Sequence, residues 1–367
     1  MAGDAQHTEA PAARATGAGS RPGERVRIGL MGFGRVGRSL LRVLRGHPRL
    51  EVVAIAGPCE AEALEYLLRF DTLLGRFPEE IGRTEDHLVV GGRPIAFLTG
   101  RPGTESDPDW RELGVDCVVE ATGRPGVGRS ELEGHLARGA ARVVLCVPPA
   151  EPPDRTVLMG VNDDALRASD RIVSNGSCTA HAAAPILAML DEAFGVERVF
   201  LNSVHAYTNE QRLADVPAEE PRRGRAASEN IIPQQAGTAA VLEAALPDLA
   251  GKVIASAMNV PVPNGSVVDM VCWHREPVSV ELINEVVRTA ASTERWKRTV
   301  AYQSEPIVSS DVLRSPCSST FDAEATMAMD GRISKTLAWF DNGWGYVHRA
   351  VELIERLAAL DAEEAAR

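Results

Sequence analysis

Apolar strands alternate with helical patterns in the first half of the chain. Residues 25–30, RVRIGL, predict a short strand that runs directly into glycines. The next stretch, GFGRVGRSLLRVLRG at 32–46, predicts a turn followed by a helix with one apolar face. Further apolar runs predict strands at 51–57, 115–123 and 141–149, and a hairpin through Gly91 and Gly92. This alternation favours a parallel, doubly wound α/β sheet of the Rossmann type.

The pattern changes after residue 178. Long strand-like runs stand at 196–208, 251–274 and 335–342, and helical stretches at 239–249 and 280–292 separate them. This texture predicts an α+β domain with a mainly antiparallel sheet. Residues at the end of the chain, from 347 onward, return to a helical period.

Composition narrows the class of protein. The chain has 367 residues, enough for two domains, and its 44% hydrophobic and 25% charged content is that of an ordinary globular protein. A net charge of −12 gives no overall attraction to nucleic acid or to anionic membranes, and no segment approaches a membrane span. Residues 1–24, rich in Ala, Gly, Thr and Pro, predict a disordered tail rather than a signal peptide. Six scattered cysteines favour a reducing cytoplasm, and no spacing predicts a metal site.

Three glycines suggest a nucleotide-binding turn. Gly32, Gly34 and Gly37 form G-x-G-x-x-G after a strand and before a helix. In this context the first glycine allows a tight turn, the second lets the backbone approach a pyrophosphate, and the third packs helix against strand. The alternative is that the glycines serve only the turn between the strand and the helix.

The residue expected to read the cofactor ribose is absent. A carboxylate about 20 residues after the glycines usually binds the ribose 2′-hydroxyl, but Gly57 and Pro58 stand there. Glu60 and Glu62 lie slightly beyond and are possible substitutes. No arginine stands beside them to bind a 2′-phosphate, so NAD and NADP both remain open.

One cysteine has the surroundings of a nucleophile. Cys178 lies at an expected helix start in SNGSCTAHAAAP, and Pro185 indicates that this helix is short, kinked or starts late. His205 follows near the end of an apolar strand. A helix N-terminus and an imidazole both favour a thiolate. A lone cysteine is usually structural, but this set with an upstream dinucleotide site suggests thiol-dependent aldehyde oxidation.

These residues resemble the phosphorylating glyceraldehyde-3-phosphate dehydrogenases, and the closely related erythrose-4-phosphate dehydrogenases share the plan. The similarity runs from about Arg25 to about Leu357. The motifs that carry it are GFGRVGR, RFDTLLGRF, EATG, LMGVN, SNGSCTAH, SVHAYT, RRGRAASENIIP, VPNGSVVDM, SSDV, SSTFDA and WFDNGWGY.

The resemblance implies a fold and a mechanism. It implies an NAD(P)-binding Rossmann domain at 25–177, completed by a C-terminal helix at 344–360, a catalytic domain at 178–343, and a homotetramer. Cys178 is then expected to attack an aldehyde and His205 to act as general base. The nicotinamide takes the hydride, and inorganic phosphate releases an acyl phosphate.

The resemblance also assigns binding residues. Those expected at the cofactor are Gly32, Phe33, Gly34, Arg35, Val36, Gly37, Arg101, Thr122, Gly123, Asn342 and Tyr346. Those expected at the aldehyde and phosphate are Ser177, Thr179, Thr208, Arg223, Gly237 and Asn259.

Two of the family's anion contacts are changed here. The arginine expected to clamp the terminal phosphate of the substrate is replaced by Asn259, and a threonine of the inorganic-phosphate pocket is replaced by Ala236. An asparagine offers only neutral hydrogen bonds where an arginine offers a charged, bidentate clamp. We therefore expect weaker handling of a phosphorylated aldehyde.

Several functions remain open within this resemblance. The chain is expected to be an ordinary glycolytic enzyme, or a specialised one for another aldehyde such as erythrose 4-phosphate or a phosphonate. An inhibitor-resistant duplicate is a third alternative. A non-catalytic relative is a fourth, although the retained Cys178 and His205 argue against it.

Overall fold

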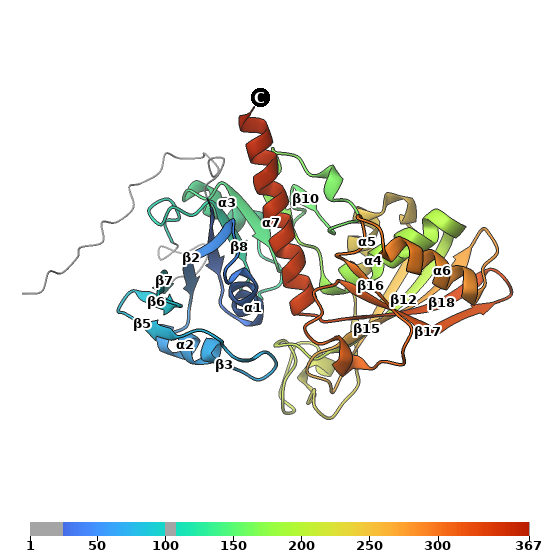
Figure 1. Cartoon of the computed structure of the whole chain (residues 1–367). Helices are drawn as coiled ribbons and strands as arrows, with labels where there is room; N and C mark the ends of the chain where they lie inside the picture. The colour runs from blue at the N-terminus through green and yellow to red at the C-terminus, as the bar shows by residue number, and fades with distance from the viewer. Residues whose placement is uncertain (1–24, 100–107, 367) are drawn as a thin grey trace, which may run out of the picture.

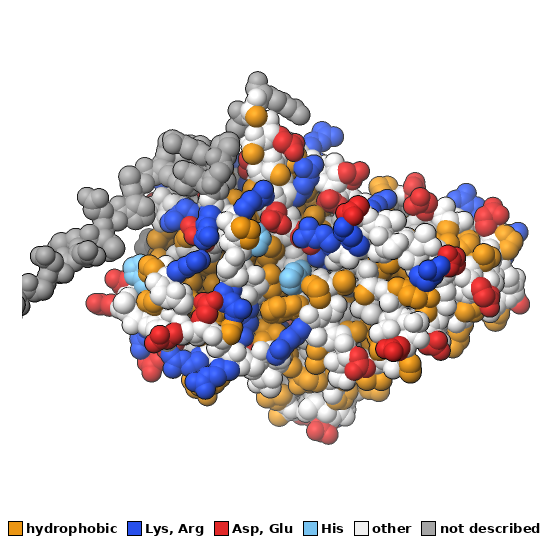
Figure 2. Space-filling model, in the orientation of Figure 1, with side chains coloured by type: hydrophobic (Ala, Val, Ile, Leu, Met, Phe, Trp, Pro, Cys, Tyr) orange, Lys and Arg blue, Asp and Glu red, His pale blue; other side chains and the backbone are white. Residues whose placement is uncertain are grey.

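A computed structural model describes residues 25–99 and 108–366. Two lobes lie on either side of the long C-terminal helix α7, Trp344–Ala365 (Figure 1). The predicted tail at 1–24 and the predicted cofactor residue Arg101 lie outside the described residues. Acidic and basic side chains are intermixed over the face shown in Figure 2, so no single sign of charge dominates it.

The first lobe contains a nine-stranded sheet in the order β10-β11-β9-β8-β1-β2-β7-β6-β5. Every neighbouring pair from β10 to β7 is parallel, and the two pairings of β6, with β7 and with β5, are antiparallel. The predicted parallel α/β sheet is confirmed. Its strands are β1 (Val26–Met31), β2 (Leu50–Gly57), β5 (Ile81–Arg83), β6 (His87–Val90), β7 (Arg93–Thr99), β8 (Cys117–Glu120), β9 (Arg142–Leu145), β10 (Arg155–Thr156) and β11 (Ile172–Ser174).

Helices and a small hairpin complete this lobe. The apolar face expected at 32–46 forms α1 (Arg35–Leu44), which buries Leu40, Leu41 and Leu44. These side chains share one hydrophobic core with Leu353 and Ile354 of α7. The remaining elements are α2 (Ala61–Arg69), β3 (Phe70–Asp71), β4 (Gly75–Arg76), α3 (Arg129–Ala137) and η1 (Asp163–Ala165).

The hairpin predicted through Gly91 and Gly92 is confirmed. Strands β6 and β7 pair antiparallel with Val90 opposite Arg93. Both glycines have positive φ angles, 57° and 78°, which the two-residue turn requires and which other residues rarely adopt.

The second lobe contains a seven-stranded sheet in the order β13-β14-β12-β15-β18-β17-β16. Four of its six pairings are antiparallel, so the predicted mainly antiparallel sheet is confirmed. Its strands are β12 (Val196–Ala206), β13 (Ile232–Gln235), β14 (Val253–Val260), β15 (Ser266–His274), β16 (Val300–Gln303), β17 (Ser319–Met329) and β18 (Ile333–Phe340). Its helical segments are α4 (Cys178–Phe194), η2 (Pro221–Gly224), α5 (Thr238–Ala245), η3 (Pro247–Leu249), α6 (Val280–Ala291) and η4 (Ser309–Val312).

Helix α4 corrects one expectation. It begins at Cys178 and continues for 17 residues, so Pro185 makes it neither short nor late. A proline inside a helix removes one backbone hydrogen bond, here the one to the carbonyl of His181. Twelve residues of α4 are buried, and it packs on β15, β17 and β18. Tertiary burial therefore overrides the local cost of the proline. In the described ranges, no helix is both long and apolar enough to cross a bilayer.

Candidate active site

The turn between β1 and α1 has the shape of a dinucleotide-binding turn. Gly32 has a φ of 97°, and a Cβ there would overlap the backbone of Ala121 and Thr122. A Cβ on Gly37 would overlap the carbonyl oxygen of Gly32, so this glycine brings helix and turn together. A Cβ on Gly34 would meet nothing within 4 Å. The middle glycine thus faces open space at the N-terminus of α1, where backbone N–H groups bind phosphate.

The neighbouring strand ends form the rest of this edge. Thr122 donates its backbone N–H to the buried carboxylate of Glu120 at 3.0 Å, and its hydroxyl donates to the same oxygen. Gly57 ends β2, and a side chain there would again meet nothing within 4 Å. Of the two substitute acids, Glu62 pairs with Arg83 and Glu60 is an exposed residue before α2.

The turn before α7 is organised by one aspartate. Asp341 accepts hydrogen bonds from the backbone N–H groups of Gly343 and Trp344 at 2.8 and 2.7 Å. These bonds fix the turn that contains Asn342. The Oδ1 atom of Asn342 accepts a hydrogen bond from the Ser266 hydroxyl at 3.4 Å. Tyr346 is buried, and burial raises the pKa of its phenol well above the usual value.

Cys178 and His205 come together as the sequence predicts. Cys178 is the first residue of α4, and its N-cap Ser177 accepts a hydrogen bond from the Ala180 N–H at 3.1 Å. His205 lies on β12, one residue before its end. The Cys178 Sγ and His205 Nε2 atoms are 3.5 Å apart. A second histidine near Cys178 in the sequence, His181, instead contacts the Asn175 carbonyl oxygen, and burial lowers its pKa to about 3.

The electrostatics of this pair favour a thiolate. Burial alone raises the pKa of the Cys178 thiol, but the hydrogen bond and charge of His205, with hydrogen bonds from Thr179, bring it below its ordinary value. Burial alone lowers the pKa of His205, but its interaction with Cys178 raises it above the ordinary value. Both net shifts stabilise a thiolate–imidazolium pair at the N-terminus of α4.

The opposite side of the imidazole is also held. His205 Nδ1 lies 2.7 Å from the carbonyl oxygen of Ala206. The side-chain amide of Asn259 donates to the same oxygen at 3.3 Å, and Asn259 itself is only 6% exposed. The predicted substrate residue Asn259 is therefore already bonded to the protein.

The other residues predicted to bind anions, with the cofactor residue Arg35, have contacts of their own within the protein or are not tied to Cys178 by a hydrogen bond. Thr208 donates its hydroxyl to Gln211 at 3.0 Å, and Thr179 lies 3.4 Å from the hydroxyl of Ser203. Arg35, beside the cofactor turn, donates to Asn209 at 3.4 Å and so links the two lobes. Gly237 is exposed directly before α5, and no hydrogen bond ties its position to Cys178.

Arg223 shows a feature that sequence reasoning missed. Its guanidinium lies 3.2 Å from Glu220 and 3.6 Å from Glu210, so two carboxylates face the one arginine. The spacing of Glu220 three residues before Arg223 was a possible signal for the first pair. The pair with Glu210 depends on how the loop folds and had no local signal.

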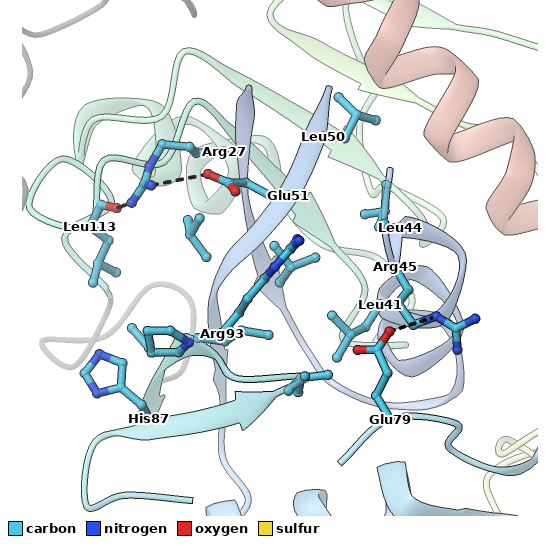
Figure 3. Close-up of a pocket in the computed structure, with 18 of the residues that line it drawn as sticks. Arg27, Leu41, Leu44, Arg45, Leu50, Glu51, Glu79, His87, Arg93 and Leu113 are labelled. Carbon is cyan, nitrogen blue, oxygen red and sulfur yellow. Dashed lines mark hydrogen bonds and ion pairs between the residues drawn. The ribbon is translucent and has the colours of Figure 1, made fainter. Parts of the chain in front are cut away.

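A separate cavity lies away from these residues. It has a volume of about 740 Å³ and is lined by the amino-terminal ends of β1, β2 and β7, whereas the glycine turn lies at their carboxyl ends (Figure 3). Its charged groups include the pairs Arg27–Glu51 and Arg45–Glu79. We assign it no part in the chemistry of Cys178. Within the described residues, no group of three or more His, Cys, Asp or Glu side chains forms a metal site.

Comparisons with known proteins agree with this geometry. Residues 26–126 match the family model of the glyceraldehyde 3-phosphate dehydrogenase NAD binding domain, and residues 177–342 match that of the C-terminal domain. The glyceraldehyde-3-phosphate dehydrogenase of Geobacillus stearothermophilus is 41% identical over 338 residues, 91% of this chain and 98% of the relative. That of Mycobacterium avium is 42% identical over 335 residues, with 90% and 97% covered. That of Streptomyces coelicolor is 41% identical over 330 residues, with 89% and 97% covered.

The thiolate–imidazolium pair predicts how Cys178 reacts with pH. Iodoacetamide should alkylate Cys178 at lower pH than the exposed Cys59, because only the thiolate reacts and His205 lowers the pKa of Cys178. His205→Asn should move the midpoint of Cys178 alkylation to higher pH and leave that of Cys59 unchanged. Mass spectrometry of the two peptides measures both rates. Equal Cys178 midpoints in the wild type and the variant would contradict the pairing.

Proposed function

This chain belongs to the glyceraldehyde-3-phosphate dehydrogenase family, and we propose on that premise that it oxidises an aldehyde through a thioester on Cys178 and releases an acyl phosphate. Family membership makes it an NAD(P)-dependent oxidoreductase. The observation that carries the proposal is the 3.5 Å contact between Cys178 Sγ and His205 Nε2. We further propose a catalytic domain at 178–343. We propose a cofactor domain at 25–177, to which residues 344–360 of α7 are added.

The residues present fit a dinucleotide. Open space above Gly34 and beside Gly57 accommodates it, and the N-terminus of α1 offers N–H groups to its pyrophosphate. We propose that the glycine turn, Thr122, Gly123, Asn342 and Tyr346 hold it. When bound, its nicotinamide supplies the hydride acceptor.

The chain's own groups divide the remaining chemistry between them. The Cys178 thiolate attacks the aldehyde carbon and forms a C–S bond, and the C=O double bond becomes a C–O single bond whose oxyanion takes the Nε2 proton of the His205 imidazolium; the first N–H of α4 faces the same oxygen. The neutral His205 Nε2 then takes the hydroxyl proton back as the carbon loses its hydride to the bound nicotinamide. A phosphate oxygen attacks the resulting thioester, the C–S bond breaks, and Cys178 leaves as a thiolate. We propose that Ser177, Thr179, Arg223 and Gly237 contact this phosphate.

Removing each member of the pair tests the mechanism. Cys178→Ala should abolish aldehyde oxidation and leave NAD(P) binding intact, because the thiolate forms the only covalent intermediate. His205→Asn should slow kcat by about 10²–10⁴-fold, the usual effect of a positioned acid–base. NAD(P)H absorbance measures turnover, and cofactor titration measures binding. Oxidation by Cys178→Ala at nearly the wild-type rate rejects the assignment, and a small effect of His205→Asn makes that residue structural.

Two observations support a substrate other than ordinary glyceraldehyde 3-phosphate. Asn259, where the family resemblance expects an arginine, is neutral and already donates to Ala206. Arg223, the remaining cation, is paired with Glu210 and Glu220. Because two carboxylates face one guanidinium, this region disfavours the terminal phosphate of an aldehyde in addition to inorganic phosphate. We propose that the aldehyde carries less negative charge at its far end than a phosphate monoester, or that phosphorylated aldehydes bind with high KM.

Charge at residue 210 tests this specialisation. Glu210→Gln should lower KM for glyceraldehyde 3-phosphate and erythrose 4-phosphate by about two- to fivefold, as expected for one exposed charge. It should not change KM for uncharged aldehydes in the same panel. Glu219→Gln removes an exposed charge from the same loop and serves as the matched control. Wild-type kcat/KM on glyceraldehyde 3-phosphate equal to that of the glycolytic relatives refutes the specialisation.

Gly57 bears on the choice between NAD and NADP. We propose that discrimination is weak because no carboxylate ends β2. Gly57→Asp is sterically allowed, since a side chain there meets nothing within 4 Å. It should raise kcat/KM for NAD and lower it for NADP, because its carboxylate binds the ribose hydroxyls and repels a 2′-phosphate. Steady-state kinetics with both cofactors measure the ratio. If the ratio does not move, another residue reads the ribose, and Glu60→Gln identifies whether it is Glu60.

We also propose a cytoplasmic homotetramer. Helices α4, α5 and α6 pack against the seven-stranded sheet. Phe200, Ile254 and Trp273 of the sheet remain 46%, 64% and 39% exposed, and Phe200 pairs in register with Ile254. Exposed apolar side chains grouped on a sheet face support contact with another copy. All six cysteines are free, which supports a reducing compartment.

A further inference from the structure

The backbone of Ala206 is fixed at both of its polar groups, the N–H and the carbonyl. Its carbonyl oxygen accepts from His205 Nδ1 at 2.7 Å and from Asn259 Nδ2 at 3.3 Å. Its N–H donates to Ser266 Oγ at 3.0 Å. Ala206 is completely buried, so water does not replace these partners. The two peptide groups that flank the Ala206 Cα are therefore held by side chains from two other strands, Asn259 of β14 and Ser266 of β15.

This carbonyl determines the state of His205. A carbonyl oxygen only accepts hydrogen bonds, so the His205 Nδ1 that faces it carries the proton. In the neutral imidazole, Nε2 then carries the lone pair and lies 3.5 Å from Cys178 Sγ. The tautomer and the direction of the ring thus both depend on where the Ala206 oxygen lies.

Asn259 is placed to hold that oxygen. Strands β12 and β14 are parallel, with His205 in register with Asn259 and Ala206 with Val260. Asn259 is also paired on its other side, with Ile232 of β13, so its backbone cannot shift along the sheet without breaking two pairings. Asn259 is only 6% exposed, and its Nδ2 donates to the Ala206 carbonyl.

We propose that Asn259 is a positioning residue for the general base: its amide holds the Ala206 carbonyl and, through it, the tautomer and direction of His205. The inference rests on the proposed role of His205 toward Cys178. It assigns Asn259 a function that does not require contact with the substrate.

The Ala206 N–H is linked through Ser266 to Asn342, a proposed cofactor residue. Ser266 accepts from the Ala206 N–H, and its hydroxyl donates to Asn342 Oδ1 at 3.4 Å. With Oδ1 accepting from Ser266, the Asn342 amide keeps its Nδ2 donors for another partner. The buried backbone of Ala206 therefore connects the imidazole, at its carbonyl, with the proposed nicotinamide residue, through its N–H and Ser266.

Asn259→Leu tests the proposal because leucine is similar in size but has no donor. The variant should lose about three- to tenfold in kcat, the effect of one neutral hydrogen bond, with little change in aldehyde KM. The pH midpoint of Cys178 alkylation should rise in the same direction as in His205→Asn, but by less. A substrate contact instead raises KM and leaves the alkylation profile unchanged, and that result overturns the proposal.

A matched control is available elsewhere in the chain. Asn284 on α6 also donates its side-chain amide to an alanine carbonyl, that of Ala323, at 3.0 Å. Asn284→Leu makes the same chemical change away from His205 and should leave both kcat and the alkylation midpoint unchanged. If Asn259→Leu does not fold, Asn259→Ser, whose side chain is too short to keep the amide contact, is measured in the same way.

The alkylation readout separates this proposal from the proposed function. It needs only Cys178, His205 and iodoacetamide, not a known aldehyde. A raised midpoint in a protein that oxidises no aldehyde supports the positioning role and rejects the oxidation. Normal oxidation with an unchanged midpoint and unchanged kcat in Asn259→Leu rejects the positioning role alone.

Discussion

The 3.5 Å contact between Cys178 Sγ and His205 Nε2 joins two elements that reach it for different structural reasons. Cys178 is carried by α4, whose alanine-rich surface is buried along most of its length, so the start of the helix cannot move without disturbing the core. His205 is carried by β12, which is paired on both sides, with β14 and β15. The thiol and the imidazole are thus held by rigid elements, which keeps their distance and their mutual pKa shifts fixed.

The surroundings of the pair decide which charges the site tolerates. His181, on the same helix, stays neutral because burial lowers its pKa to about 3, so it does not compete with His205 for the thiolate. Farther out, Arg223 is shared by Glu210 and Glu220. A thiolate is therefore stabilised at Cys178, whereas two carboxylates offset the positive charge of Arg223. The proposed chemistry and the proposed substrate preference follow from the same local distribution of charge.

Much of this site was predictable from local sequence. The glycine turn was, because Gly32 and Gly37 act through backbone contacts inside one strand–turn–helix unit. The helix start at Cys178 and the strand end at His205 suggested their pairing, and the family resemblance gave each residue its role. The bond from Asn259 to Ala206 was not predictable, because the two residues are 53 positions apart and meet only through the register of two strands. Of the three effects expected of Pro185, a short helix and a late start are wrong, since the local effect of the proline is outweighed by burial that appears only in the folded chain.

The topology explains why the chain enters α4 at the same edge of the sheet as the glycine turn. Strands β1, β8, β9 and β11 run parallel, so their carboxyl ends share one edge of the sheet. Strand β1 ends at Met31, next to Gly32, and β8 ends at Glu120, which holds Thr122. Strand β11 ends at Ser174, four residues before Cys178. The sheet that presents the glycine turn therefore also delivers the thiol to the same edge, and Asn175 at this crossing donates to the Tyr346 carbonyl of α7 at 3.2 Å. Under the proposed function, a hydride acceptor held by the glycine turn would lie toward an aldehyde carbon on Cys178, because one parallel sheet carries the turn and leads into α4.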